Sequence, residues 1–153
     1  MTSRSIMRKG GAAAAGVVAL VSVWEGVSYV AYPDIVGVMT ICYGETKNVR
    51  AGQRATKAEC DATLMRSLIE HEDGMLRCTS RVMPTSVQQA GISLTYNIGV
   101  GAWCRSTARK LVEAGRFLEA CNAMSRFNRA GGSIIKGLIN RRRDEHRLCV
   151  RDL

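Results

Sequence analysis

The sequence contains few of the residues that interrupt helices or mark a special class of protein. Its 153 residues include only two prolines and 5% aromatic residues, and no tract rich in Gly, Pro or Ser divides the chain. Collagen-like and disordered classes are therefore excluded, and a β-sandwich with many turns is disfavoured. The length fits one domain with a single hydrophobic core. A mostly helical protein is expected.

The chain also lacks the residue spacing of a metal site. No CxxC pair occurs, the only histidines are His71 and His146, and zinc ligands usually come in close pairs. We therefore expect no metal and no cofactor. The even number of cysteines favours three disulfides formed in an oxidising compartment over buried free thiols. Fifteen pairings are possible, and the preferred set joins neighbouring predicted elements: Cys42–Cys60, Cys78–Cys104 and Cys121–Cys149.

No apolar run is long enough to cross a bilayer with ease. Arg4, Arg8 and Lys9 precede an uncharged stretch over residues 10–24, which as a helix would reach about 22 Å, short of the roughly 30 Å hydrocarbon core. Extension to Tyr32 would bring Glu25 into the bilayer. Residues 1–24 are interpreted as an uncleaved export segment preceding a domain over 25–153. A cleaved signal peptide and a buried soluble helix are the alternatives.

Positive charge dominates, with 22 Lys and Arg against 13 Asp and Glu and a net charge of +9. The excess lies mostly in residues 105–153. Such a basic lobe attracts polyanions, which include nucleic acid, anionic lipid and acidic cell-wall polymers. Two non-enzymatic alternatives follow: a nucleic-acid-binding module, although no recognised motif is present, and a cationic membrane-active protein that lyses cells without hydrolysis.

Helical periodicity covers most of the chain beyond a short β-rich region. Residues 32–50 combine β-branched residues with Pro and Gly and predict a loop and short hairpin. Thr56 and Glu59 form a capping-box pattern at the start of a helix. The predicted helices cover residues 57–77, 84–98, 106–114, 117–126 and 134–149. This order predicts an α+β fold with a small β lobe, a helical C-terminal lobe and a cleft between them.

The region between the apolar helix and the predicted hairpin contains two carboxylates and a threonine. Glu25 closes the helix, Asp34 follows in a polar turn, and Thr40 comes six residues later. Glycosidic cleavage needs one protonated carboxyl and one ionised carboxylate. Apolar surroundings from Trp24 and Val27 would suit the acid role of Glu25. Spacing alone favours a solvated Glu and a turn-forming Asp over catalysis, because a Glu and an Asp this close occur by chance in most chains.

The pattern E-x8-D-x5-T, followed by T-I-C-Y-G-E-T, resembles the catalytic signature of phage T4-type lysozymes, glycoside hydrolase family 24. Further motifs continue the similarity over roughly residues 24–149: Y-N-I-G-V-G at 96–101, W-C-R-S-T at 103–107 and G-L-I-N-R-R-R-D-E at 137–145. The resemblance implies a two-lobed lysozyme-like fold. It also implies a phage-encoded, monomeric enzyme without affinity for nucleic acid.

The implied reaction is inverting hydrolysis of the β-1,4 bond between N-acetylmuramic acid and N-acetylglucosamine in peptidoglycan, for host lysis. Glu25 would be the general acid, Asp34 would help to activate water, and Thr40 would position it. The N-terminal segment resembles that of signal-anchor-release endolysins of the phage 21 type. This implies export by the host Sec machinery, attachment through residues 10–32 to the periplasmic face of the inner membrane, and release into the periplasm.

Several other residues match the family pattern or depart from it. Glu45 replaces the usual His, and Thr46, Tyr96 and Ser106 occupy positions that touch the glycan in the family. For Tyr96 core packing is an equal interpretation, and for Ser106 a helix cap. Trp103 is expected in the core, His71 is expected at the surface, and at most two of the three consecutive arginines at 141–143 can face inward.

Overall fold

The computed structural model describes residues 4–153 and is mostly helical, with two short antiparallel hairpins. The elements in chain order are α1 (Ile6–Lys9), α2 (Gly11–Glu25), β1 (Ser28–Pro33), β2 (Met39–Cys42), α3 (Lys57–Arg77), α4 (Thr85–Ile98), α5 (Val100–Arg105), α6 (Thr107–Glu113), α7 (Phe117–Met124), β3 (Arg129–Ala130), β4 (Ser133–Ile134), α8 (Lys136–Cys149) and the 3₁₀ helix η1 (Val150–Asp152).

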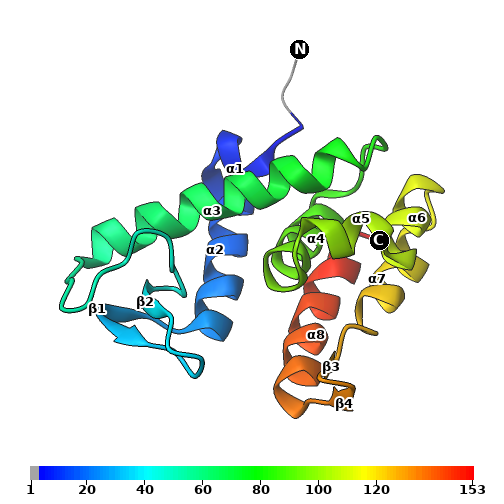
Figure 1. Ribbon diagram of the computed structural model, residues 1–153. Coiled ribbons are helices and arrows are strands. Elements are labelled where there is room, and N and C mark those ends of the chain that lie inside the picture. The colour runs from blue at the N-terminus through cyan, green and yellow to red at the C-terminus, as the bar shows by residue number, and fades with distance from the viewer. Residues whose placement is uncertain (1–3) are drawn as a thin grey trace.

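The long helix α3 connects two unequal lobes. The β1–β2 hairpin lies near the start of α3, whereas α5, α6 and α7 lie toward its other end (Figure 1). The hairpin pairs Tyr32 with Thr40 and Pro33 with Met39. At the start of α3, Thr56 and Glu59 complete the predicted capping box. The expected α+β architecture with a small β lobe is confirmed.

Helix α4 forms the centre of the larger lobe and packs against α2, α3 and α8. All ten residues from Ser86 to Thr95 are buried, although five of them are polar. Each of four polar side chains faces a different neighbour: Ser86 Oγ donates to Cys149 O, Gln88 Nε2 to Arg4 O, Gln89 Nε2 to Ala13 O, and Ser93 Oγ to Glu145 Oε1. These bonds offset the cost of burying polar groups, so α4 lies in the core without an exposed face.

The N-terminal segment is part of this core. In α2, Ala14, Val17 and Val21 are buried. Gly16 lets α4 approach closely, since a Cβ there would lie 2.8 Å from Gln89 Nε2. Among residues 4–153, no helix is long and apolar enough to cross a bilayer.

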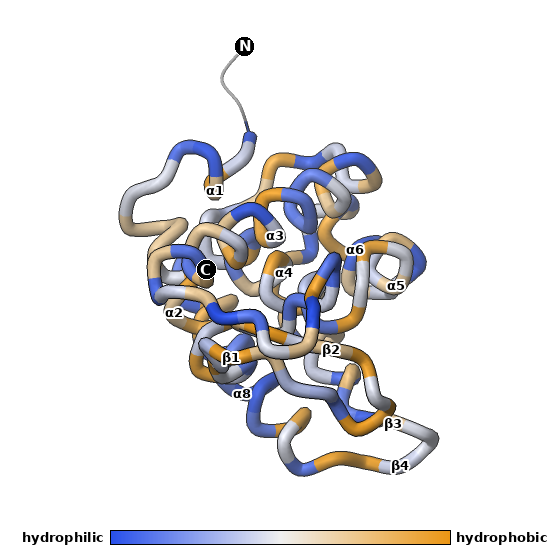
Figure 2. Tube along the Cα trace, turned by 60° about the vertical axis from the view of Figure 1, so that its left-hand side comes forward, coloured by the Kyte–Doolittle hydropathy of each residue, from blue (hydrophilic) through white to orange (hydrophobic). Residues whose placement is uncertain are grey.

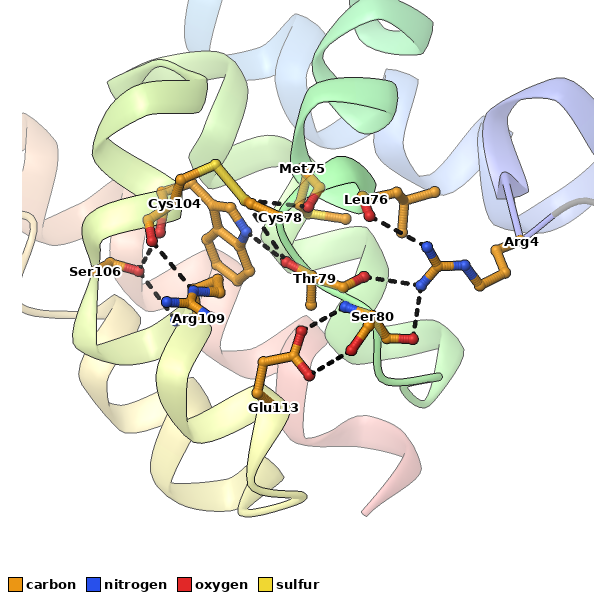
Figure 3. The surroundings of a disulfide bond; sticks show 11 residues. Arg4, Met75, Leu76, Cys78, Thr79, Ser80, Cys104, Ser106, Arg109 and Glu113 are labelled. Carbon is orange, nitrogen blue, oxygen red and sulfur yellow. Dashed lines mark hydrogen bonds between the residues drawn. A yellow bond between two sulfur atoms is a disulfide. The ribbon is translucent and has the colours of Figure 1, made fainter.

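Polar groups fasten the chain before α2 to helix α3. Arg4 Nη1 donates to Thr79 O at 2.8 Å and Ser80 O at 3.0 Å, and its Nη2 donates to Leu76 O at 3.1 Å (Figure 3). Arg8 makes a bidentate ion pair with Asp73. The guanidinium of Arg4 thus satisfies carbonyls left open where α3 ends.

The three disulfides are Cys42–Cys60, Cys78–Cys104 and Cys121–Cys149. This is the pairing preferred from the sequence. The first joins β2 to α3, the second joins the end of α3 to α5, and the third joins α7 to α8. Trp103, next to the second bridge, is fully buried as expected, and its Nε1 donates to Thr79 Oγ1 at 3.0 Å.

Three local elements differ from the sequence prediction. Strand β1 begins at Ser28, before the predicted hairpin region. Helix α4 ends at Gly99 with a positive φ of 91°, but a new helix, α5, starts at once and passes through Gly101. Residues 129–134 form the β3–β4 hairpin, which projects beyond the body of the molecule (Figure 2). Two glycines at its tip, Gly131 and Gly132, adopt positive φ, which the turn requires.

Candidate active site

Glu25 is the last residue of α2 and faces helix α8. Its Oε1 accepts a hydrogen bond from Arg141 Nη1 at 2.6 Å. The Arg141 side chain is 6% exposed and that of Glu25 23% exposed. The sequence predicted apolar surroundings for this carboxyl, but Val27 is exposed. This expectation was wrong because α8 brings a buried guanidinium against Glu25 from far along the chain.

A buried charge cluster holds Arg141 in place. Arg142 Nη2 donates to Glu145 Oε1 at 2.9 Å, Arg141 Nε approaches the same oxygen at 3.4 Å, and Ser93 Oγ donates to it at 2.7 Å. Burial raises the pKa of Glu145 and lowers that of Arg142. The residue that contacts Glu25 is therefore fixed by an ion-pair cluster within the core.

The turn after β2 lies on the other side of Glu25. Ile41 and Glu45 exchange two backbone hydrogen bonds, at 2.9 and 2.8 Å, which close a tight turn. At Gly44, where φ is 96°, a Cβ would lie 3.9 Å from Glu25 Oε2. Glu25 thus has one oxygen on Arg141 and the other beside this turn.

A cavity of about 310 Å³ opens next to Glu25. Its lining comes from the end of α2, the turn after β2, α3 and α4: Glu25, Tyr43, Gly44, Glu45, Thr46, Ser67, His71, Tyr96 and Asn97. The Tyr96 hydroxyl donates to Tyr43 O at 3.2 Å. Burial, with further contributions from the charges of Glu25 and Glu45, raises the pKa of Tyr96 to about 12. Its phenol stays neutral at physiological pH and can donate or accept hydrogen bonds.

Asp34 and Thr40 lie in the β1–β2 hairpin rather than in the lining of this cavity. Asp34 Oδ1 accepts hydrogen bonds from Val36 N at 2.9 Å and Val38 N at 2.8 Å, so the carboxylate stabilises the turn between the strands. Thr40 is buried, and its hydroxyl donates to Val38 O at 3.0 Å. The β1–β2 hairpin therefore carries both side chains, Asp34 in its turn and Thr40 in strand β2.

The other predicted glycan contacts divide into two groups. Glu45, Thr46 and Tyr96 line the cavity with Glu25. Ser106 instead caps α6, where its Oγ accepts from Arg109 N at 3.0 Å and donates to Trp103 O at 2.7 Å (Figure 3). Its hydroxyl therefore has two backbone partners and lies outside the lining of the Glu25 cavity.

Sequence reasoning missed three residues of the site. Arg141 was recognised only as one of the arginines that can face inward. His71, expected at the surface, lines the cavity, and its ring centroid lies 5.1 Å from that of Tyr96. Asn97 also lines the cavity, and its buried Oδ1 has no hydrogen-bond partner within the described chain. For His71 the sequence did contain a signal: Ser67 and His71 are four residues apart, so they lie on the same face of α3.

Residues 4–153 contain no group of three His, Cys, Asp or Glu side chains placed to hold a metal ion. The side chains that line the Glu25 cavity offer carboxyl, hydroxyl, amide and imidazole groups, and Arg141 adds a guanidinium. A carboxyl held by a guanidinium at the edge of a polar cavity can exchange a proton with a bound substrate.

Comparisons with known proteins show the family of this chain. The Phage lysozyme family model matches residues 22–145. The chain is 39% identical over 127 residues to the SAR-endolysin of Enterobacteria phage P21, covering 82% of this chain and 77% of that protein. It also resembles the muramidase domain of SpmX from Asticaccaulis excentricus, with 29% identity, coverage of 89% and 95%, and a TM-score of 0.81.

The fold is shared with the active form of P1 phage endolysin Lyz, at a TM-score of 0.83, 23% identity, and coverage of 90% of this chain and 84% of that one. These matches show that the chain belongs to the phage lysozyme family, and it is a glycoside hydrolase of the muramidase class that serves host lysis.

Proposed function

We propose that Glu25 is the general acid in hydrolysis of the β-1,4 bond between N-acetylmuramic acid and N-acetylglucosamine. The observation that carries this proposal is the position of Glu25, at the edge of a polar cavity with one oxygen held by buried Arg141. A charge-assisted hydrogen bond of this kind fixes the orientation of a carboxyl group. The second oxygen, beside Gly44, is the one that meets the glycosidic oxygen.

Asp34 and Thr40 would act on the attacking water from the hairpin. The two backbone amides on Asp34 Oδ1 hold this carboxylate in a fixed direction. The Thr40 hydroxyl donates to Val38 O and so keeps its lone pairs available to accept from water. Attack by this water on the face of the sugar opposite Glu25 gives inversion of configuration. Substrate binding would have to bring the hairpin and Glu25 to either side of one sugar ring.

The test is hydrolysis of purified peptidoglycan by wild type and by Glu25→Gln. The amide cannot donate the proton, so the rate should fall by at least about a hundredfold, since general acid catalysis alone supplies roughly 10²–10⁴. Glu119→Gln, which changes an exposed carboxyl on α7, is the matched control and should keep the wild-type rate. A folded Glu25→Gln protein with substantial turnover would contradict the acid role.

Asp34→Asn and Thr40→Ala test the water-activating role separately. Each should lower kcat by about a hundredfold or more, because correct placement of the nucleophile is lost. NMR of the freshly released anomer then reports the stereochemistry. A β product formed first would refute inversion.

We further propose that residues 1–24 form an export segment and residues 25–153 the catalytic domain. Host Sec machinery would export the chain, residues 10–32 would attach it to the periplasmic face of the inner membrane, and release would bring it into the periplasm as a monomer. The SAR-endolysin names of its relatives and the uncharged stretch before Glu25 support this proposal. In the described conformation one face of the same stretch, with Ala14, Val17 and Val21, packs into the protein core.

N-terminal sequencing of protein recovered from the membrane and periplasmic fractions tests this route. The intact N-terminus is expected in both fractions. A mature chain that begins beyond residue 15 would show cleavage and so contradict an uncleaved export segment.

A further inference from the structure

A separate cavity of about 310 Å³ lies where the chain before α2 meets the end of α3 and the start of α4. The residues that line it are Arg4, Ile6, Lys9, Leu76, Arg81, Val82, Met83, Thr85 and Gln88. None of these residues lines the Glu25 cavity. The lysozyme reaction therefore leaves this cavity without a function.

The cavity has an apolar floor and an apolar residue at its rim. Ile6 and Met83 are buried and form the floor with the half-buried Leu76. Val82, in contrast, is 76% exposed. Hydrocarbon at both levels means that a ligand with an apolar portion gains free energy by covering these side chains.

Three cations surround this floor, and none of the described residues that line the cavity is acidic. Lys9 and Arg81 are exposed, and neither enters an ion pair recorded for residues 4–153. Arg81 Nε donates to Glu113 O at 2.8 Å. The guanidinium of Arg4 donates to three backbone carbonyls (Figure 3). Because carbonyls are neutral, these contacts leave the positive charge of both arginines uncompensated.

We propose that this cavity binds the phosphate headgroup of an anionic phospholipid. Lysine offers a compact charge and arginine a planar fork, and both suit phosphate oxygens. The glycerol and first methylene groups of the lipid would lie on the apolar floor, and Val82 would enter the acyl region. A zwitterionic lipid is disfavoured because the lining offers no acid to its ammonium group. Duplex DNA is disfavoured because it has no hydrocarbon chain to cover the floor.

The site depends on the docked position of the N-terminal segment. Arg4, Ile6 and Lys9 all precede α2, and Ile6 N donates to Glu72 Oε1 at 2.7 Å. A ligand that binds only this docked chain stabilises it by mass action. The inference goes beyond the proposed function, since the described conformation forms the cavity whether or not Glu25 acts as an acid.

The first test is flotation of the purified full-length protein with vesicles of phosphatidylcholine, with and without phosphatidylglycerol. Wild type should float only with the vesicles that contain phosphatidylglycerol. In the double variant Lys9→Gln with Arg81→Gln, the partition coefficient should fall about 25-fold, since each cation near an anionic surface contributes about fivefold in affinity. Equal flotation with both kinds of vesicle would overturn the proposal.

The apolar part of the site is tested by Val82→Ser. Because Val82 is exposed, its replacement should leave the fold intact. The partition coefficient should fall about fivefold through loss of buried hydrocarbon. A Val82→Ser protein that binds as tightly as wild type would show that charge alone attracts the protein, and the lipid site would be refuted.

A charge-matched control separates this cavity from the general positive charge of the protein. The double variant Arg126→Gln with Arg143→Gln removes two exposed cations outside the cavity. Its partition coefficient should stay within about twofold of wild type, because salt screens charges that lie away from the contact. Equal losses in the two double variants, or a loss in neither, would overturn the site. Duplex DNA binding that depends on Lys9 and Arg81 would assign the cavity to nucleic acid instead.

A titration observed by NMR locates the ligand on the protein. Dihexanoyl phosphatidylglycerol, kept below its micelle concentration, is added to ¹⁵N-labelled protein, with dihexanoyl phosphatidylcholine and inorganic phosphate in parallel samples. Amide shifts should cluster at residues 6–9, 76 and 81–85 and should be largest with phosphatidylglycerol. Hydrogen exchange at residues 6–9 should slow in the same sample. Shifts confined to residues 105–153, or equal shifts with inorganic phosphate, would overturn the lipid site. A protein that binds this lipid but cleaves no peptidoglycan would refute the proposed function alone.

Discussion

Two buried carboxylates in this protein have opposite kinds of partner. Glu72 is fully buried, and within residues 4–153 its recorded hydrogen-bond donors are all neutral: Ser5 Oγ, Ile6 N at 2.7 Å, Met7 N at 3.2 Å and Gln88 Nε2 at 2.8 Å. Glu145 is equally inaccessible, but two of its three partners are arginines. Both acids lie on helices that pack against α4.

Glu72 and Glu145 have different partners because each one holds a different part of the structure in place. Glu72 binds the first backbone amides of α1, so it fastens the N-terminal segment to α3 and α4 through groups that water can also satisfy. Glu145 neutralises guanidiniums that could not be buried alone, and one of them contacts Glu25. The neutral contacts of Glu72 attach the N-terminal segment through hydrogen bonds that water could replace. The ionic contacts of Glu145 keep Arg141 and Arg142 in place beside Glu25.

Glu145→Gln should have the largest effect. Loss of the charge leaves the buried Arg142 without a counter-ion and leaves Arg141 paired with Glu25 alone, which should lower the free energy of unfolding by about 3–5 kcal/mol. The activity of the remaining folded protein should also fall, because Arg141 no longer holds Glu25 in place. Denaturant unfolding combined with kcat per folded molecule measures both effects.

The control for Glu145→Gln is Asp144→Asn on the same helix, where the side chain is 37% exposed and 3.5 Å from Arg147. Its unfolding should be close to that of wild type. A Glu145→Gln protein that is destabilised but keeps the wild-type kcat would show that the cluster serves stability alone, and the contrast between the two acids would then disappear.

Glu72→Gln should have an intermediate effect on stability and leave kcat per folded molecule unchanged. The amide keeps the shape of the side chain but weakens the four hydrogen bonds, and its NH₂ group faces N–H or O–H donors that it cannot accept from. The free energy of unfolding should fall by about 1–3 kcal/mol. Hydrogen exchange should accelerate first in residues 6–9. Glu70→Gln, two positions earlier and exposed, controls for the loss of charge on α3.

If Glu72→Gln lowers kcat as much as Glu145→Gln does, the N-terminal contacts are coupled to the site. Glu72 would then not serve only to attach the N-terminal segment, and its role would not differ from that of Glu145 in the active site. Uniform acceleration of exchange across the whole chain would also contradict local release of the N-terminal segment.

The Arg8–Asp73 ion pair should give the smallest effect, visible only in acid. Its hydrogen bonds hold the pKa of Asp73 below the ordinary value of 3.8. A depressed pKa contributes stability above the unfolded value, and this contribution is lost as the pH falls through the folded value. Between about pH 2 and pH 5, the melting temperature of Asp73→Asn should therefore vary less than that of wild type. Identical profiles would show that the pair adds nothing to docking.

Local signals in the sequence predicted much of the fold. The capping box before Lys57, the glycine after Ile98 and the apolar spacing between them placed α3 and α4 within a residue of their observed bounds. Neighbouring elements also indicated the disulfide pairs. Helix α5 and the β3–β4 hairpin were missed because they are short, and their formation depends on packing rather than on periodicity.

The site was less accessible to sequence reasoning. The motif predicted Glu25, Asp34 and Thr40 as catalytic residues, but the partner of Glu25 lies 116 positions later, in a run of three consecutive arginines that the sequence does not distinguish. The polar residues of α4, such as Ser93 and Gln88, are buried. Their partners come from α8, α3 and the N-terminal segment, and no local pattern shows which of these will be close.

The sequence by itself determined the family, the boundaries of α3 and α4, and the acid that ends α2, because motifs, caps and periodicity depend on residues near one another in the chain. Only the tertiary structure decided that Arg141 holds Glu25, that Glu72 receives the N-terminal segment, and that this segment forms a cationic cavity with α3 and α4. These contacts depend on which helix faces pack together. That choice is made by the summed burial of the whole core and not by any one segment.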